Sequence, residues 1–247
     1  MTETAIILAA GFGSRLGGLT DKIPKGFLEI GNSSLINRSV ECLLRNGINK
    51  IYIGTGYLSE HYEEYASHFP GLISCVKNER FANTSSMDTL YNFRNIINQD
   101  FLLLESDLLY EDRALSSLIE SDQQNIVLAS GRTSSGDEVY INADGRGALL
   151  SMTKDKSAAD CAFGELVGIS KVSIKSYQDM CMIFRRQGPL DIDYEYVMTY
   201  VKKPNNFIVH KIDDLAWCEI DDKKHLKRAK GMVIKAIDAA NDLYRHQ

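Results

Sequence analysis

Residues 8–31 read LAAGFGSRLGGLTDKIPKGFLEIG, and this stretch decides the fold. It overlaps the apolar run TAIILAA (residues 4–10), whose composition is typical of a buried parallel strand bounded by Gly11. Glycines directly after a strand let the backbone approach a phosphate chain and turn its N–H groups toward it. Arg15 and Lys25 add fixed positive charge. The stretch therefore predicts a strand that leads into a loop for a ligand with several negative charges.

Two common glycine-rich phosphate motifs do not fit this loop. The dinucleotide fingerprint needs a third glycine where Leu16 stands, and it needs an acidic strand end about 20 residues further on, which is lacking. The P-loop needs Gly-Lys followed by Ser or Thr, whereas Ser14 and Arg15 follow Gly13. Both motifs are excluded.

Composition and charge narrow the class of protein. Of the 247 residues, 44% are hydrophobic and 25% are charged, which is ordinary for a globular protein. The formal net charge of −5 gives no bulk attraction to nucleic acid or to an acidic membrane surface, so an anionic substrate would need a local basic pocket. No apolar stretch has the length of a membrane span, and the acidic N-terminus is unlike a signal peptide. We expect a cytoplasmic protein without membrane insertion.

The cysteines and histidines argue against a zinc site. The five cysteines include no Cys-x-x-Cys pair, and the five histidines are scattered. We expect reduced, mostly buried thiols at these positions: Cys42, Cys75, Cys161, Cys181 and Cys218.

Short apolar runs alternate with amphipathic segments in the first half of the chain, which predicts a mostly parallel, doubly wound α/β sheet. The expected strands are 4–10, 49–57, 71–79, 100–110 and 124–130. The expected helices are 34–47, 59–69, 84–97 and 113–122.

The second half has a different pattern. Residues 138–154 read as a hairpin-like pair around Asp144-Gly145, and further strands are expected at 164–173, 205–212 and 216–221. Helices are expected at 173–186 and 193–201, with a long closing helix at 223–247. No repeat or proline-rich linker interrupts the chain, so we expect a single domain. It would have a first half (about 1–130), a substrate-facing portion (about 131–220) and a C-terminal helix (221–247).

The glycine loop resembles that of the nucleotidyltransferases that join a nucleoside triphosphate to a phosphorylated small molecule. Their pattern is similar to L-A-A-G-x-G-x-R-L, then Thr, then Pro-Lys. The matching positions here are Leu8, Ala9, Ala10, Gly11, Gly13, Arg15, Leu16, Thr20, Pro24 and Lys25. Two departures are Gly17-Gly18, where sugar nucleotidyltransferases often have proline, and Gly26, where a larger residue is usual. The resemblance implies a Rossmann-like three-layer α/β/α sandwich with a mostly parallel, mixed central sheet.

The resemblance also implies the chemistry. An acceptor oxygen attacks the α-phosphorus of the nucleotide and pyrophosphate leaves, so Arg15 and Lys25 are the expected catalytic residues that offset negative charge. Lys25 would contact the α-phosphate. The loop residues Leu8, Ala9, Ala10, Gly11, Gly13 and Ser14 would wrap the triphosphate.

The family uses a divalent ion, and carboxylates stand where its ligands are expected. Asp107 follows the most apolar strand candidate and matches the family's metal-binding aspartate. Glu219 and Asp221 lie two residues apart in AWCEIDD, so both would face the same side of a strand. Mg²⁺ needs one or two such carboxylates. Asp107 with either acid suffices; choline-type cytidylyltransferases favour Asp221, whereas sugar-type members favour Glu219.

The base and acceptor sites are expected further along the chain. The segment TGYLSEHYEEY resembles one in the small bacterial choline-phosphate cytidylyltransferases, which implies that Thr55, Gly56 and Tyr57 lie by the cytosine. Ser85 and Ser86 begin a predicted helix, a natural anion site that could serve the nucleotide or the acceptor. Ordinary capping by Thr84 or Ser85 is the alternative.

The acceptor is the open question. A quaternary ammonium group calls for an aromatic cage, and the chain has one tryptophan, whereas a primary ammonium calls for carboxylates. The segments SMTK, GELVGISK and TSSMDTL resemble the 2-aminoethylphosphonate cytidylyltransferases, which implies transfer of CMP from CTP to that acceptor. Phosphocholine or a sugar phosphate is the alternative. The expected acceptor-binding residues are Asn83, Lys154, Glu165, Asp144 and Asp193. The closing helix could pack on the domain, serve a homodimer or lead into a further enzyme module.

Overall fold

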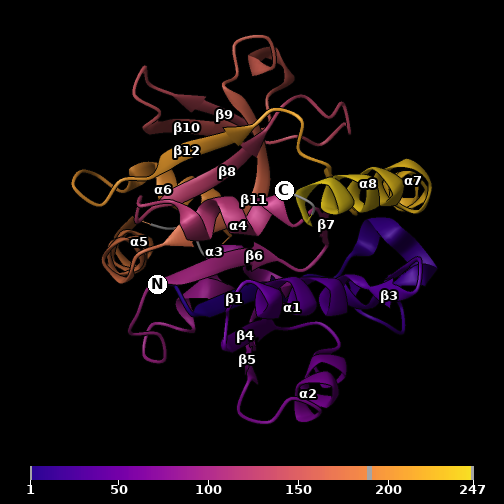
Figure 1. Ribbon diagram of the computed structural model, residues 1–247. Helices are drawn as coiled ribbons and strands as arrows, with labels where there is room; N and C mark the ends of the chain where they lie inside the picture. Colours follow the sequence, from indigo (N-terminus) through magenta and orange to yellow (C-terminus); the bar gives the residue numbers. More distant parts are fainter. Residues whose placement is uncertain (1, 188–190, 246–247) are drawn as a thin grey trace.

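The computed structural model describes residues 2–187 and 191–245 and is built around one large mixed sheet (Figure 1). The strand order is β10-β9-β11-β6-β1-β4-β5, and β8 pairs with β11 and β12. These strands are β1 (Thr4–Ala9), β4 (Lys50–Thr55), β5 (Ile73–Lys77), β6 (Phe101–Glu105), β8 (Ile126–Ser130), β9 (Tyr140–Ala143), β10 (Leu149–Thr153), β11 (Gly164–Val172) and β12 (Ile208–Ile212).

The first half of the sheet is parallel, as the β-α alternation predicts. Strand β1 lies between β4 and β6, and both neighbours run parallel to it. Every residue of β1 is buried, which explains why its sequence is a continuous apolar run rather than an alternating one.

The second half is mixed. Strand β11 runs antiparallel to β6, β8 and β9, and the expected hairpin around Asp144-Gly145 is confirmed as the antiparallel pair β9–β10. The long strand expected at 100–110 is wrong in one respect, because it divides after Glu105. Ser106 N still donates to Leu8 O at 3.0 Å, and the chain then turns away at Asp107. Strand β7 (Leu108–Tyr110) leaves the sheet to pair with β13 (Trp217–Glu219).

Helices cover both faces of the sheet and bury its two sets of alternating side chains. Helices α1 (Leu35–Arg45), α2 (Ser59–Ser67) and α4 (Arg113–Glu120) contribute to the core cluster that contains Ile7 and Leu104. Helices α3 (Ser86–Tyr91), α5 (Ile174–Gln187) and α6 (Tyr194–Tyr200) contribute to the cluster that contains Ile6 and Leu103. The three-layer α/β/α arrangement is confirmed.

A third apolar cluster ties the glycine loop to the last segments of the chain. Leu16 and Ile30 pack with Cys218, Ile220 and Val233. The closing helix is divided into α7 (Lys223–Arg228), a π-helical turn (Ala229–Val233) and α8 (Ile234–Arg245). The short pair β2 (Glu29–Ile30) and β3 (Ser33–Ser34) completes this end. The cluster holds the first 30 residues against the segment that carries Glu219 and Asp221.

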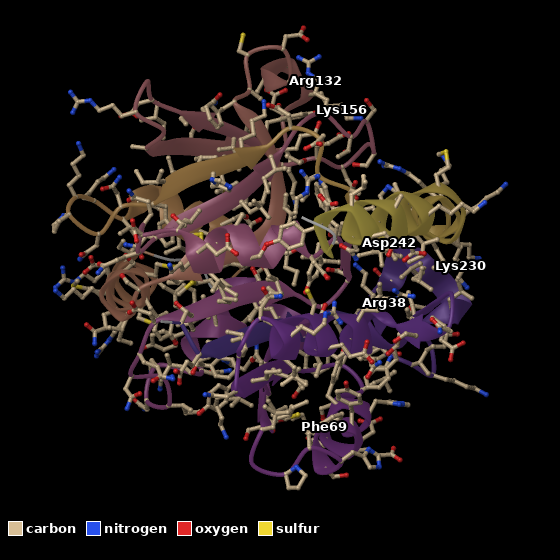
Figure 2. The ribbon with its side chains drawn as sticks, viewed as in Figure 1. Arg38, Phe69, Arg132, Lys156, Lys230 and Asp242 are labelled. Atoms are coloured by element: carbon tan, nitrogen blue, oxygen red, sulfur yellow. The ribbon has the colours of Figure 1, made fainter. Side chains whose placement is uncertain are left out.

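Charged side chains such as those of Lys156, Lys230 and Asp242 are exposed on the outside of the molecule (Figure 2). None of the helices within residues 2–187 and 191–245 combines the length and the apolar character needed to cross a bilayer. The five cysteines are free thiols; Cys42 and Cys218 are buried, Cys75 and Cys181 are partly buried, and Cys161 is exposed.

The core around β1 provides a test of the packing. Ile7 is fully buried in the central strand, so Ile7→Ala should lower the free energy of unfolding by about 2–5 kcal/mol, measured by urea denaturation. Leu150 on β10 is 57% exposed, and Leu150→Ala should change the value by less than about 0.5 kcal/mol. Equal losses for the two variants would contradict the assigned core.

Candidate active site

A cavity of ≈ 550 Å³ opens where β1 and β6 end and β11 begins. The expected nucleotide-binding residues that line it are Leu8, Ala9, Ala10, Gly11, Gly13, Ser85 and Ser86. The other expected site residues that line it are Arg15, Lys25, Asp107, Glu219, Asp221, Lys154, Glu165 and Asp193. The fold therefore brings together residues from both ends of the chain.

The segment expected to contact the base lies behind the glycine loop instead. Thr55, Gly56 and Tyr57 are not among the lining residues. Tyr57 N donates to Ala10 O at 3.1 Å, and a Cβ at Gly56 would lie 2.7 Å from the same oxygen. The Tyr57 ring packs 5.2 Å from that of Phe12. In this structure the segment packs against the glycine loop at Ala10 and Phe12, outside the cavity lining.

Three other expected site residues, Ser14, Asn83 and Asp144, also lie outside the lining. Ser14 begins the 3₁₀ segment of the loop, and Asn83 ends another before α3. Asp144 is explained by the hairpin: its Oδ1 accepts from Arg146 N at 2.8 Å and from Ala148 N at 2.9 Å. The geometry gives Asp144 a turn-stabilising role and does not support acceptor binding.

The glycine loop folds back on the stem of Lys25. Gly13 has φ +65°, and a Cβ there would lie 2.8 Å from Lys25 Cγ, so both conformation and space require glycine. Thr20 Oγ1 donates to Gly13 O at 3.0 Å and closes the turn. After Pro24, a second 3₁₀ turn (Lys25–Phe27) presents the lysine to the cavity. The spacing of the glycine and lysine in the motif thus has a geometric reason within this chain.

Lys25 is held between two carboxylates from distant parts of the chain. Its Nζ lies 2.7 Å from Asp107 Oδ2 and also contacts Asp221 Oδ1. Burial opposes the charge on Lys25, but the two carboxylates outweigh it and raise its pKa. Burial likewise opposes the charge of Asp221, yet Lys25 lowers the pKa of that carboxyl below its ordinary value. Lys25 and Asp221 are therefore both ionised at neutral pH.

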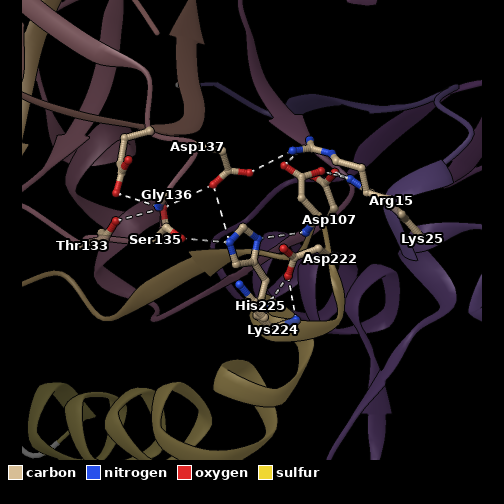
Figure 3. Close-up of polar contacts among 12 residues, drawn as sticks. Arg15, Lys25, Asp107, Thr133, Ser135, Gly136, Asp137, Asp222, Lys224 and His225 are labelled. Carbon is tan, nitrogen blue, oxygen red and sulfur yellow. Dashed lines mark hydrogen bonds and ion pairs between the residues drawn. The ribbon is translucent and has the colours of Figure 1, made fainter. Parts of the chain in front are cut away.

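Arg15 forms the outer part of the same network (Figure 3). Its guanidinium lies 2.7 Å from Asp221 Oδ2 and 3.2 Å from Asp137 Oδ2, and its side chain is 60% exposed. Exposed ion pairs of this kind contribute little stability. Arg15 can therefore exchange these carboxylates for phosphate oxygens at small cost.

His225 connects the network to the loop at residues 133–138 (Figure 3). Its Nδ1 accepts the backbone N–H of Asp221 at 3.3 Å, so the neutral ring carries its hydrogen on Nε2, which donates to Ser135 O at 3.3 Å. Ligand atoms of Asp137, Asp221 and His225 lie within 4.8 Å of one another. Both ring nitrogens are engaged, so this cluster is suited to positioning Asp221 rather than to holding a metal.

A second acidic cluster fits a divalent ion better. Oxygen atoms of Glu105, Asp107 and Glu219 lie within 4.8 Å of one another, and Asp107 Oδ1 is buried without a hydrogen-bond partner. Oxygen donors of this kind suit Mg²⁺. Burial raises the pKa of Glu219 and Glu105, and the charge of Asp107 adds to it, so a cation at this point would relieve repulsion. The structure thus groups Asp107 with Glu219 and Glu105, although Asp107 also contacts Lys25, whereas Asp221 contacts both Lys25 and Arg15.

The described lining has many more acids than cations. The nine acids are Glu105, Asp107, Asp137, Glu138, Glu165, Asp193, Glu195, Glu219 and Asp221. The four cations are Arg15, Lys25, Lys154 and Arg228. A site with this excess of carboxylates can receive a polyphosphate only together with additional positive charge. A bound divalent ion and a cationic acceptor are the two natural sources.

The site role of His225 could not be found from the sequence. A lone histidine at the start of a basic helix carries no motif, and its partner Ser135 is 90 residues away along the chain. Glu105 stands two residues before Asp107 at a strand end, a position that indicates a second carboxylate beside the predicted metal ligand.

The comparisons with known proteins agree with this geometry. The model of the family described as "Nucleotidyl transferase" matches residues 4–135, a little over half of the chain. The chain belongs to the nucleotidyl transferase family. The matched part contains the glycine loop, Lys25 and Asp107.

Relatives extend the likeness over most of the chain. It is 26% identical over 243 residues to CTP:phosphoglutamine cytidylyltransferase of Campylobacter jejuni, covering 88% of this chain and 95% of the relative. It is 25% identical over 238 residues to CMP-5'-(3-aminopropyl)phosphonate synthase of Streptomyces rubellomurinus, covering 91% of this chain but 38% of that longer relative.

A solved structure confirms the nucleotidyltransferase fold. The CTP:phosphocholine cytidylyltransferase of Streptococcus pneumoniae superposes with a TM-score of 0.79 at 20% identity. The match covers 94% of this chain and all of that one.

His225 can be tested through the buried amide that it satisfies. His225→Ala leaves the Asp221 N–H without an acceptor, which should lower the free energy of unfolding by about 1–3 kcal/mol in denaturant titrations. His225→Asn offers an amide oxygen in place of Nδ1 and should recover part of the loss. An alanine variant as stable as the wild type would contradict this role.

Glu195 makes the stability of the ligand-free protein depend on pH. Burial, together with Asp193, raises its pKa from 4.5 to about 7. The folded state therefore keeps a proton that the unfolded chain releases, and stability falls as the pH rises from 4.5 to about 7. Glu195→Gln should be about 1–3 kcal/mol more stable than the wild type at pH 8 and nearly equal at pH 4.5. Unfolding midpoints at the two pH values measure this, with the exposed Glu29→Gln as control; a constant difference would contradict it.

Proposed function

We propose that this nucleotidyltransferase transfers CMP from CTP to 2-aminoethylphosphonate, releases pyrophosphate and uses Mg²⁺. Both the Campylobacter and the Streptomyces relatives are named for cytidylyl chemistry, and the Streptomyces relative is named for an amine-bearing phosphonate. The segments SMTK, GELVGISK and TSSMDTL, which resemble 2-aminoethylphosphonate cytidylyltransferases, support the same acceptor.

The arrangement of charges suits the reaction. A phosphonate oxygen of the acceptor attacks the α-phosphorus, and the bond from that phosphorus to the bridging oxygen of the β-phosphate breaks, so the electron pair leaves with pyrophosphate. Lys25 and Arg15 would exchange part of their carboxylate contacts for phosphate oxygens and offset the developing charge. Glu105, Asp107 and Glu219 would hold Mg²⁺, which screens the phosphate charge when bound. This step needs no covalent intermediate with the protein.

The excess of carboxylates in the cavity is the observation that carries the choice of acceptor. Nine acids against four cations favour an acceptor that brings its own positive charge. The aromatic lining residues are Phe12, Tyr62, Phe81 and Trp217, and among these four the ring contact is that of Phe12 with Phe81 at 5.1 Å, beside the glycine loop. A quaternary ammonium cage requires several rings around one point. The lining therefore favours a primary ammonium over choline.

The test is pyrophosphate release from CTP and Mg²⁺ with a panel of acceptors. We expect 2-aminoethylphosphonate to give a kcat/KM at least about tenfold above those of phosphocholine and glucose 1-phosphate, because only its ammonium can donate hydrogen bonds to the carboxylates. Lys25→Ala should be inactive with every acceptor, which verifies that the signal is the enzyme's own. Activity with phosphocholine alone would reject the proposed acceptor and leave the cytidylyl transfer standing.

A further inference from the structure

Two charged side chains of the cavity have no direct partner. Lys154 follows β10, and Glu195 lies in the first turn of α6; both line the cavity. Within the described residues, neither forms an ion pair at 4.0 Å or less, and neither side chain has a hydrogen bond to another residue. Glu195 is 5% exposed. A buried carboxylate without a partner is costly, so its position needs an explanation.

The other acids of the cavity are already engaged. Glu165 accepts from Thr133 N at 2.8 Å, and Asp193 accepts from Ser86 Oγ at 3.0 Å. Glu138 accepts from Gly136 N at 2.9 Å. Asp107, Asp137 and Asp221 contact Lys25 or Arg15, while Glu105 and Glu219 belong to the cluster that suits a metal. Glu195 is the acid of the described lining that is left for a ligand.

The neighbours of Glu195 fix it in place. Asp193 is tied to the start of α3 through Ser86, and Ser86 Oγ also accepts from Tyr194 N at 3.0 Å. The Tyr194 hydroxyl donates to Glu105 Oε1 at 2.8 Å, at the end of β6. The two residues before Glu195 are thus hydrogen-bonded to the start of α3 and to the end of β6. Apart from a hydrogen bond with its own backbone N–H, the carboxylate of Glu195 has no hydrogen-bond partner within the described residues, so the anchored backbone fixes its position.

Lys154 and Glu195 affect each other across a gap. Lys154 is an exposed residue whose charge is opposed by partial burial, and Glu195 and then Asp193 raise its pKa above the ordinary value. Helix α6 packs against β10, which accounts for their proximity. Their separation exceeds the 4.0 Å of a direct ion pair. Opposite charges held apart in one cavity complement a short zwitterion whose own charges lie a few bonds apart.

We propose that Glu195 binds the ammonium group of the acceptor, with the anionic end of the acceptor directed to Lys154. This assignment rests on the proposed function and gives its acceptor site a specificity-determining residue. A primary ammonium has three N–H donors and can satisfy a buried carboxylate. A trimethylated nitrogen has none, so it would give the buried carboxyl of Glu195 no hydrogen-bond donor.

The experiment compares two acceptors that differ only in the amine, 2-aminoethylphosphonate and ethylphosphonate. In the wild type, the ratio of their kcat/KM values should be roughly 10- to 100-fold in favour of the amine. Glu195→Gln should bring the ratio close to one while the KM for CTP stays unchanged. General damage to the fold lowers both activities together and does not move the ratio.

Two further variants complete the design. Glu195→Asp keeps the charge on a shorter side chain and should give an intermediate ratio; it also serves as the test if Glu195→Gln does not fold. The exposed Glu29→Gln should keep the wild-type ratio. A Glu195 variant that keeps the full preference for the amine overturns the proposal.

Failure of the subsite and failure of the function are distinguishable. Wild-type turnover of 2-aminoethylphosphonate with an unchanged ratio in both Glu195 variants rejects the subsite alone. Absence of turnover in the wild type rejects the proposed function. In that case calorimetric binding of 2-aminoethylphosphonate to the wild type and to Glu195→Gln decides on the subsite, and equal affinities overturn it.

Discussion

The contact of Lys25 with Asp107 and Asp221 is the constraint on which the rest of the site depends. An ammonium group this deeply buried is stable only when carboxylates offset its desolvation. Its two partners come from the end of β6 and from the segment after β13, which are 114 residues apart, from 107 to 221. The contact therefore requires that the first, middle and last parts of the chain meet at one point.

The packing of the fold brings Lys25, Asp107 and Asp221 together. The departure of β7 from the main sheet brings β13 beside Asp107, and Ile220 N donates to Asp107 O at 3.1 Å. The apolar cluster of Leu16, Ile30, Cys218 and Ile220 holds the glycine loop against the same segment. His225 then fixes the backbone of Asp221 from the opposite side. The positions of Arg15 and Lys25 thus depend on packing and hydrogen bonds around the cavity.

The excess of acids gives this site a second property. The ligand-free protein holds several carboxyls whose pKa burial raises, among them Glu105, Glu195 and Glu219. Groups of this kind reduce stability when ionised, and cations that arrive with the substrates relieve the cost. If the proposed function holds, binding of the metal and binding of the acceptor would be linked through this electrostatic balance. The carboxylates proposed to bind the metal and the acceptor therefore lower the stability of the ligand-free protein when they are ionised.

Much of this architecture could be predicted from local sequence. The strand TAIILAA, the loop motif and the hairpin at Asp144-Gly145 each depend on neighbouring residues, and the structure has all three. The division of the strand at 100–110 could not be predicted, because it depends on the pairing of β7 with the distant β13. Thr55, Gly56 and Tyr57 were placed by resemblance, and packing behind the glycine loop gives them a supporting position. Spacing alone could not predict that Asp221 contacts Lys25 and Arg15 whereas Glu219 lies with Glu105 and Asp107, because these contacts join distant parts of the chain.

The most direct test of the central claim is a crystal structure of the protein with CTP and Mg²⁺. The account predicts that the ammonium of Lys25 and the guanidinium of Arg15 lie within hydrogen-bonding distance of phosphate oxygens, with Arg15 released from Asp137. A complex in which the triphosphate binds elsewhere, while both side chains keep their carboxylate contacts, would contradict it.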